Sequence, residues 1–196
     1  MSAVTVEVPR TLYEEAMKKG VDVNELVVDA LIKALNLDPE TTARARLELA
    51  TKHLSEGRDL IDKDPAQASE KLYKAAEEVV KALAQHYGLR GVLARVDERG
   101  RWTVTDLARA VAAIADRVGK WFEEAWDTAW ALHVWGFHEA KLDSELVRRR
   151  LPSIERMVQE ARKALGNEGK GLSSSDSNMY SEATNSSTHK TLSKKL

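Results

Sequence analysis

The hydrophobic and polar positions near the start of the chain follow first the period of a strand and then the period of helices. Three valines alternate with polar residues up to Pro9: Val4, Val6 and Val8. This alternation predicts one short strand. From residue 10 to 37 apolar residues recur at helical spacing on both sides of Gly20, which predicts a short helix and then a longer one. Residues 1–37 are therefore expected to form a strand-helix-helix segment.

Two Asp-Pro pairs indicate where two long helices begin. Asp38-Pro39 and Asp64-Pro65 each place an N-cap residue before a proline at the first helical position. Apolar residues recur at helical spacing behind each pair, and the second helix is expected to end near Gly88. An all-α fold, an up-and-down helical bundle, is therefore expected over residues 38–165.

The rest of this region predicts one loop and three further helices. Residues 89–101 are rich in charge and contain two glycines, so we expect a loop. Thr103 and Asp106 approximate a capping box at the start of the next helix. Residues 121–137 are apolar on two sides, which predicts a helix in the middle of the bundle or between protomers. Pro152 is expected to open the last helix.

Composition and charge narrow the classes of partner. The 196 residues carry 30 Lys and Arg against 31 Asp and Glu, and the net charge of -1 gives no global attraction to nucleic acid or acidic membranes. The absence of cysteine excludes thiol chemistry and suits a cytoplasmic location. No apolar run is long enough to span a membrane. Residues 166–196 are rich in Ser, Thr, Asn and Gly and are expected to form a disordered tail.

Two histidines and three arginines are the candidate site residues. His133 and His138 lie five positions apart, about 140° around an ideal α-helix, which disfavours a shared metal ion. We therefore expect no metal and no cofactor. An imidazole can act as a general acid or base near neutral pH, and a structural, hydrogen-bonded histidine is the alternative.

The arginines are expected to complete this candidate site. Arg148, Arg149 and Arg150 follow the histidines within about 17 positions, and fixed positive charge beside a titrating group suits phosphate chemistry. A nucleotide or RNA would then bind where they meet, with Tyr73 and Lys74 as neighbours. The alternative is that the three arginines form a solvated face, and that the four tryptophans between positions 121 and 135 form a packed core rather than a base-stacking platform.

The front segment resembles the ribbon-helix-helix fold over VTVEVPRTLYEEAMKKGVDVNELVVDALIKAL. In that fold two chains each donate one strand to an antiparallel ribbon, so the resemblance implies a homodimer. Thr5 and Glu7 hold the outward positions that such repressors use to read DNA. Glu7 would place paired carboxylates against phosphates, which makes dimerisation the better use of the segment.

The blocks DPAQASEKLYKAAEEVVKALA, GRWTVTDLARA and AWALHVWGFHEAKLD, followed by RRLPSIERMVQEAR, resemble the archaeal PaREP family, which we place within the HEPN superfamily. The resemblance covers roughly residues 1–165 and implies a dimerising helical bundle. Catalytic HEPN proteins carry an Arg followed after four to six residues by His. Here His133 stands in the arginine position before His138, and the formal match of Arg46 with His53 lies in the first bundle helix, so we discount it.

Three functions follow as hypotheses. The first is a non-catalytic HEPN-type interaction module, associated with nucleotides, nucleic acid or a toxin–antitoxin-type protein partner. The second is an RNase-type enzyme that uses His138. The third is a DNA-binding regulator that uses the ribbon.

Overall fold

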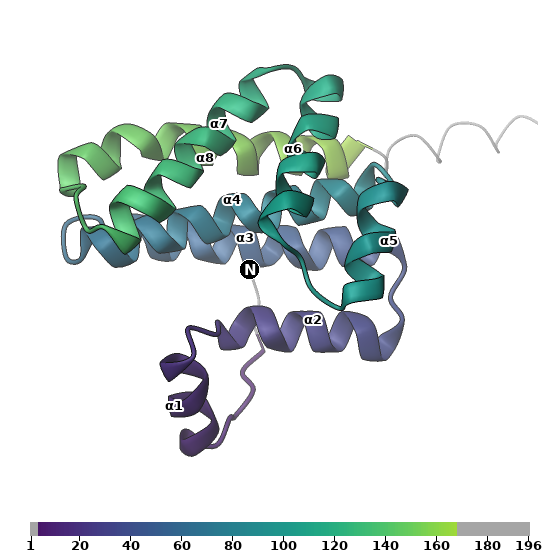
Figure 1. Ribbon diagram of the computed structural model, residues 1–196, viewed down its shortest axis with the longest axis horizontal. Coiled ribbons are helices and arrows are strands. Elements are labelled where there is room, and N and C mark those ends of the chain that lie inside the picture. The colour runs from purple at the N-terminus through teal and green to yellow at the C-terminus, as the bar shows by residue number, and fades with distance from the viewer. Residues whose placement is uncertain (1–3, 168–196) are drawn as a thin grey trace, which may run out of the picture.

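The computed structural model describes residues 4–167, and every regular element in that range is a helix (Figure 1). In chain order these are α1 (Arg10–Lys18), α2 (Val23–Leu35), α3 (Pro39–Leu60), α4 (Pro65–His86), α5 (Arg90–Arg99), α6 (Val104–Val118), α7 (Trp121–Ala131), the π-helix η1 (Leu132–His138) and α8 (Ser144–Asn167). The predicted all-helical bundle is confirmed. The predicted tail lies, beyond its first two residues, outside the described range.

Helix α4 is the centre of the bundle. It packs against α3, α8, η1 and α6, and its alanines and valines between Ala68 and Ala84 are buried on all sides. Helices α3, α4 and α8 run along the long axis, whereas α5 and α6 cross it near one end (Figure 1). The bundle is therefore up-and-down only in part.

The Asp-Pro pairs begin helices as predicted, because their local hydrogen bonds favour a helix start. The Asp38 carboxylate accepts from the backbone N–H groups of Glu40 and Thr41 at 3.0 and 2.9 Å. Asp64 accepts from the N–H of Gln67 at 3.0 Å. Each cap satisfies amides that have no partner within the helix.

Gly57 brings α3 close to α4. A Cβ atom at this position would lie 2.8 Å from the side chain of Leu72. The two helices therefore approach more closely than any other residue at position 57 would allow without a shift.

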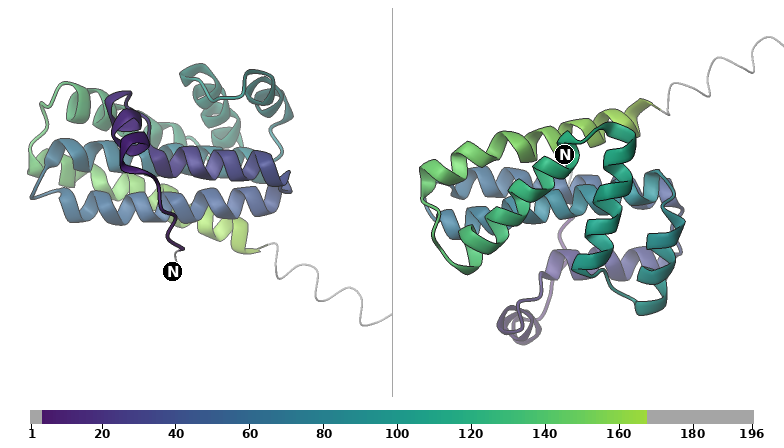
Figure 2. Two further views of the ribbon diagram at one scale, coloured as in Figure 1. Left: turned by 90° about the horizontal axis from the view of Figure 1, so that it is seen from below. Right: turned by 45° about the horizontal axis from the view of Figure 1, so that its top comes forward.

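The front of the chain differs from the prediction. Residues 4–9 form no strand, because a ribbon strand needs a second strand for its hydrogen bonds and no segment within residues 4–167 supplies one. Helix α2 lies lengthwise beside α3, and α1 projects away from the bundle (Figures 1 and 2).

Two further predictions are wrong, and a third is wrong in part. Residues 90–99 form α5 rather than a loop, because Val92 is buried in the common core. Helix α8 begins at Ser144, where Asp143 accepts from the N–H of Leu146, so Pro152 lies inside the helix. Residues 121–137 form α7 and then η1, and Trp135 is 54% exposed, so this segment does not lie wholly in the middle of the bundle; the alternative place between protomers stays a prediction.

Candidate functional site

The π-helix η1 brings His133 and His138 together. Their Nε2 atoms lie 3.1 Å apart, in hydrogen-bond contact. On an α-helix, side chains five positions apart point in different directions. In a π-helix, by contrast, the backbone hydrogen bond joins residue i to residue i+5, so such residues are neighbours. The N–H of Glu139 donates to the carbonyl of Val134 at 2.9 Å in this pattern. The predicted divergence of the two histidines is therefore wrong.

Glu70 of α4 extends the pair into a chain of three groups. Its Oε2 lies 2.9 Å from Nδ1 of His133, so a proton on Nδ1 donates to the carboxylate. Only one proton fits between the two Nε2 atoms, so one ring donates and the other accepts. His138 is exposed and retains its Nδ1 on the solvent side of this contact. The arrangement can pass a proton between the surface and a partly buried carboxylate.

Aromatic rings hold His133 in place. Tyr73 of α4 stacks on His133 with ring centroids 4.2 Å apart, and Trp130 lies 5.5 Å away in a tilted arrangement. Burial, together with the carboxylates of Glu77 and Glu70, raises the pKa of the Tyr73 hydroxyl well above its usual range. Tyr73 therefore stays neutral and acts as a packing surface for the imidazole, as expected for a neighbour of the site.

Gly136 sets the distance between η1 and α4. A Cβ atom there would lie 2.3 Å from Oγ of Ser69, whose hydroxyl donates to the carbonyl of Pro65 at 2.7 Å. The absence of a side chain at position 136 thus allows the close approach that brings His133 to Glu70.

The three arginines bind other partners. Arg148 pairs with Asp62 at 2.5 Å, and Arg149 pairs with Glu145 at 2.7 Å on its own helix. Arg150 donates to the carbonyl of Leu146. Within residues 4–167 no hydrogen bond or ion pair joins these arginines to the histidines. Their convergence on one surface stays a prediction.

Lys74, the other predicted neighbour, belongs to a different cluster. Its Nζ lies 2.9 Å from Glu25 of α2 and 3.4 Å from Glu77. Arg46 and His53, the pair that sequence reasoning discounted, are also buried on the side of α3 that α2 covers. Arg46 reaches Asp29 of α2 at 2.7 Å.

No group of three His, Asp or Glu side chains within residues 4–167 is arranged to hold a metal ion. Glu70 faces Nδ1 of His133, whereas His138 faces Nε2, so the three groups point to no common centre. None of the helices described is both long and apolar enough to cross a membrane.

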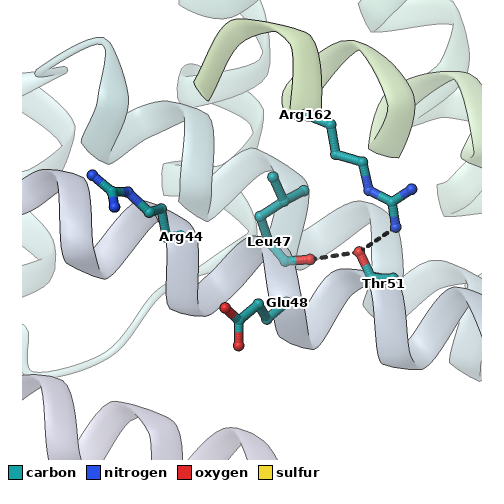
Figure 3. Close-up of a pocket in the computed structure, with 5 residues that line it drawn as sticks. All are labelled: Arg44, Leu47, Glu48, Thr51 and Arg162. Carbon is teal, nitrogen blue, oxygen red and sulfur yellow. Dashed lines mark hydrogen bonds between the residues drawn. The ribbon is translucent and has the colours of Figure 1, made fainter. Parts of the chain in front are cut away.

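Two surface hollows lie away from the histidines. One, of about 310 Å³ between α3 and α8, is lined by Arg44, Leu47, Glu48, Thr51 and Arg162 (Figure 3). Two of its polar side chains already have partners: Arg162 donates to Thr51 at 2.9 Å, and Thr51 donates to the carbonyl of Leu47 at 2.8 Å. The other hollow, of about 430 Å³, lies where α2, α3 and α5 meet. Neither contains a predicted site residue.

Sequence reasoning missed Glu70 as the partner of His133. It lies 63 positions away in the sequence, so no local signal marks it. The formal match of Arg46 with His53 did signal that α3 carries polar residues on an inner face.

The chain is similar to two solved structures and to one protein family. A crystal structure of a Sulfolobus solfataricus protein is 32% identical to this chain, with a TM-score of 0.55, and the match covers 59% of this chain and 95% of that one. A solution structure described as the Orf c02003 protein gives 32% identity, a TM-score of 0.54, and coverage of 59% and 90%. The search of curated proteins gives no match. Residues 45–158 match the archaeal PaREP1/PaREP8 family, and since that is more than half of its length, the chain belongs to this family.

Proposed function

We propose that this chain is a non-catalytic interaction module of the HEPN type that works as a homodimer, joined through the N-terminal arm of residues 4–37. The apolar surface of the arm carries this proposal. Of the twelve large hydrophobic side chains exposed in residues 4–167, nine lie in the arm: Val4, Val6, Val8, Leu12, Tyr13, Met17, Leu26, Leu31 and Leu35. A concentration of exposed apolar side chains is typical of protein interaction sites.

A second copy of the chain is the partner that suits residues 4–9. This extended segment alternates valines with polar residues and has unpaired backbone groups. An antiparallel ribbon with the same segment of another copy would pair those groups and bury the valines in one step. The arm would then place two bundles side by side.

The ion pairs of two of the three candidate arginines support a non-catalytic role. Phosphate chemistry needs a fixed cation close to the developing charge. Arg148 and Arg149 are ion-paired with Asp62 and Glu145 instead.

Sedimentation velocity at micromolar concentration tests the proposal. We expect the parent to sediment as a dimer. Leu12→Glu and Leu31→Glu should each weaken the dimer by about tenfold or more, because each places a charge in an apolar interface. Leu12 and Leu31 are 62% and 49% exposed in the single chain, so the bundle itself should be unaffected.

Val104→Glu is the matched control. Val104 is 55% exposed and belongs to α6 rather than to the arm. A monomeric parent would refute the proposal, and so would an equal loss of dimer in the Val104 variant.

A second candidate function, RNA cleavage, is favoured by the chain of Glu70, His133 and His138. In this reading Nδ1 of His138 accepts the proton of a ribose 2′-hydroxyl, whose oxygen attacks the neighbouring phosphorus. The bond to the 5′-oxygen breaks, and that oxygen takes a proton from water. His133 and Glu70 would stabilise the proton on His138, and Arg148 and Arg149 would have to leave their carboxylates, and Arg150 the carbonyl of Leu146, to bind the phosphate.

Assays on single-stranded RNA with a metal chelator present test this second candidate. If the enzyme reading holds, His138→Ala should abolish cleavage and Glu70→Gln should reduce it by about tenfold to a hundredfold. Val104→Glu again serves as the control. A parent without activity, or a His138 variant that equals it, would leave the histidines with a structural role. Salt-dependent binding of duplex DNA would instead favour a ribbon-helix-helix regulator.

A further inference from the structure

Helix α2 packs on the bundle with its acidic side and presents apolar side chains to solvent. Its carboxylates Asp22, Glu25 and Asp29 are half-buried against the bundle, whereas Leu26 and Leu31 are about half exposed, at 54% and 49%. No residue of α2 is fully buried. Charge and hydrogen bonds therefore supply part of what holds this helix to α3 and α4, together with the half-buried side chains of Val27, Val28 and Ile32.

The three carboxylates contact a set of four cations, Arg46, Lys71, Lys74 and Lys81, which we call the cation row. Asp22 lies 4.0 Å from Lys71, Glu25 lies 2.9 Å from Lys74 and also contacts Lys81, and Asp29 lies 2.7 Å from Arg46. The carboxylates stand at positions i, i+3 and i+7, the spacing of one face of a helix.

Each cation keeps a carboxylate within the bundle when α2 is absent. Lys81, which is 1% exposed, pairs with Glu77 and Glu78 at 2.9 and 2.8 Å, and Arg46 pairs with Glu78 at 3.0 Å.

Lys74 pairs with Glu77 at 3.4 Å, and Lys71 pairs with Glu56 at 2.9 Å. The main penalty for opening a charged interface is a buried cation that is left without a partner. Release of α2 would leave none in this state.

With α2 in place, carboxylates outnumber cations. Six of them, three from α2 and its cap and Glu56, Glu77 and Glu78 from the bundle, face five cations: the cation row and Lys52, which pairs with Glu56 at 3.8 Å. Burial raises the pKa of Glu78 even though Lys81 and Arg46 act to lower it. The closed interface is thus more acidic than charge balance requires.

The cation row also lies within the part of the chain that matches the family, residues 45–158, whereas α2 lies outside it. The matched region therefore contains the face that α2 covers, but not α2 itself.

We infer that the face of α3 and α4 bearing the cation row is a docking site for an acidic helix of a partner protein, with carboxylates at i, i+3 and i+7, and that α2 occupies this site as a competing intramolecular ligand. The seated α2 shows the shape and charge that the site accepts. The inference concerns the inner side of α2 and does not depend on self-association through the outer side.

A peptide that copies α2 is the probe. We would titrate fluorescein-labelled peptide of residues 21–37 into the full-length parent and into the Glu25→Gln, Asp29→Asn double variant, and follow the anisotropy. The variant holds its own α2 less tightly, so it should bind the peptide at least about tenfold more tightly than the parent does. The same peptide with Asn, Gln and Asn in place of its three carboxylates should bind neither protein.

Hydrogen exchange measures the opening directly. Amide exchange in α2 should rise about tenfold or more in the double variant while exchange in α4 stays unchanged. Circular dichroism establishes that the variant is folded. If the double variant does not fold, the single variant Asp29→Asn takes its place in the experiment, because Arg46 then still has Glu78 as its partner.

A charge exchange tests the register. Lys71→Glu, made in the double variant, should weaken binding of the acidic peptide about tenfold, and a peptide with Asp22→Lys should restore it. Lys63→Glu, at an exposed position in the turn after α3, should change nothing. Equal binding of the acidic and neutral peptides, no binding to the double variant, or unchanged exchange in α2 would each overturn the inference.

Discussion

Gly136 shows how one missing side chain can position a site. Its Cα lies so close to Ser69 that a Cβ atom would approach the serine Cβ to 2.5 Å. The contact partner is the short side chain of a residue on the rigid central helix, which cannot turn away as the end of a long side chain could. Position 136 therefore controls the distance between η1 and α4, and with it the contact of His133 with Glu70.

Gly136→Ala should accordingly destabilise the fold by about 1–3 kcal/mol, the usual cost of overpacking. Urea unfolding gives this value, and nitrogen NMR of the His133 ring would show the loss of its contact with Glu70. Adding Ser69→Gly should recover much of the loss, because it removes the atoms that the new Cβ meets. A variant as stable as the parent, with the His133 signal unchanged, would contradict this account.

At the scale of single elements, the start of α6 is stabilised by a capping box with two added arginines. Thr103 Oγ1 accepts from the N–H of Asp106 at 3.3 Å, and the Asp106 carboxylate accepts from the N–H of Thr103 at 3.2 Å. Arg95 and Arg99 of α5 bind the same carboxylate. The Thr103 hydroxyl and then Arg99 lower the pKa of Asp106 from 3.8 to about 2, although desolvation acts to raise it.

Because the folded state lowers this pKa, the carboxylate contributes stability above about pH 4 and loses that contribution as the pH falls towards 2. Asp106→Ala should therefore cost about 1–2 kcal/mol at pH 7, the range measured for lost helix caps, and almost nothing near pH 2. Thermal unfolding across this pH range gives both values. Asp97→Ala, on the exposed side of α5, is the control, and an Asp106 variant that loses stability on acidification as steeply as the parent would refute the prediction.

The elements that the sequence predicts well are those with local signals. Asp38, Asp64 and Thr103 lie next to the amides that they cap, so a few neighbouring letters reveal the helix start. Helix α5 has no side-chain cap at its start and forms because Val92 packs in the core, which no neighbouring residue reveals. The π-helix is likewise invisible, since the same residues fit an α-helical period.

At the scale of the whole molecule, the bundle follows from periodicity but the placement of the arm does not. An amphipathic pattern predicts that the apolar side faces inward, and Leu26, Leu31 and Leu35 of α2 depart from this rule because the surface beneath the helix carries the cation row. That surface is made by α3 and α4 together, from residues 35 positions apart between Arg46 and Lys81. The candidate site was predictable in the same partial way: His133 and His138 could be chosen, but their mutual contact and Glu70 depend on tertiary structure.

The π-helix also changes how the histidine pair should be sought in other sequences. On an α-helix, residues four apart face the same way, and in a π-helix residues five apart do so. A chain that lost one residue between the two histidines could therefore keep them in contact by returning to an α-helix. We therefore expect deletion of a single residue at this point to keep the pair in contact, so an evolutionary comparison should accept a spacing of four or five and ask instead whether a glutamate on the central helix accompanies it.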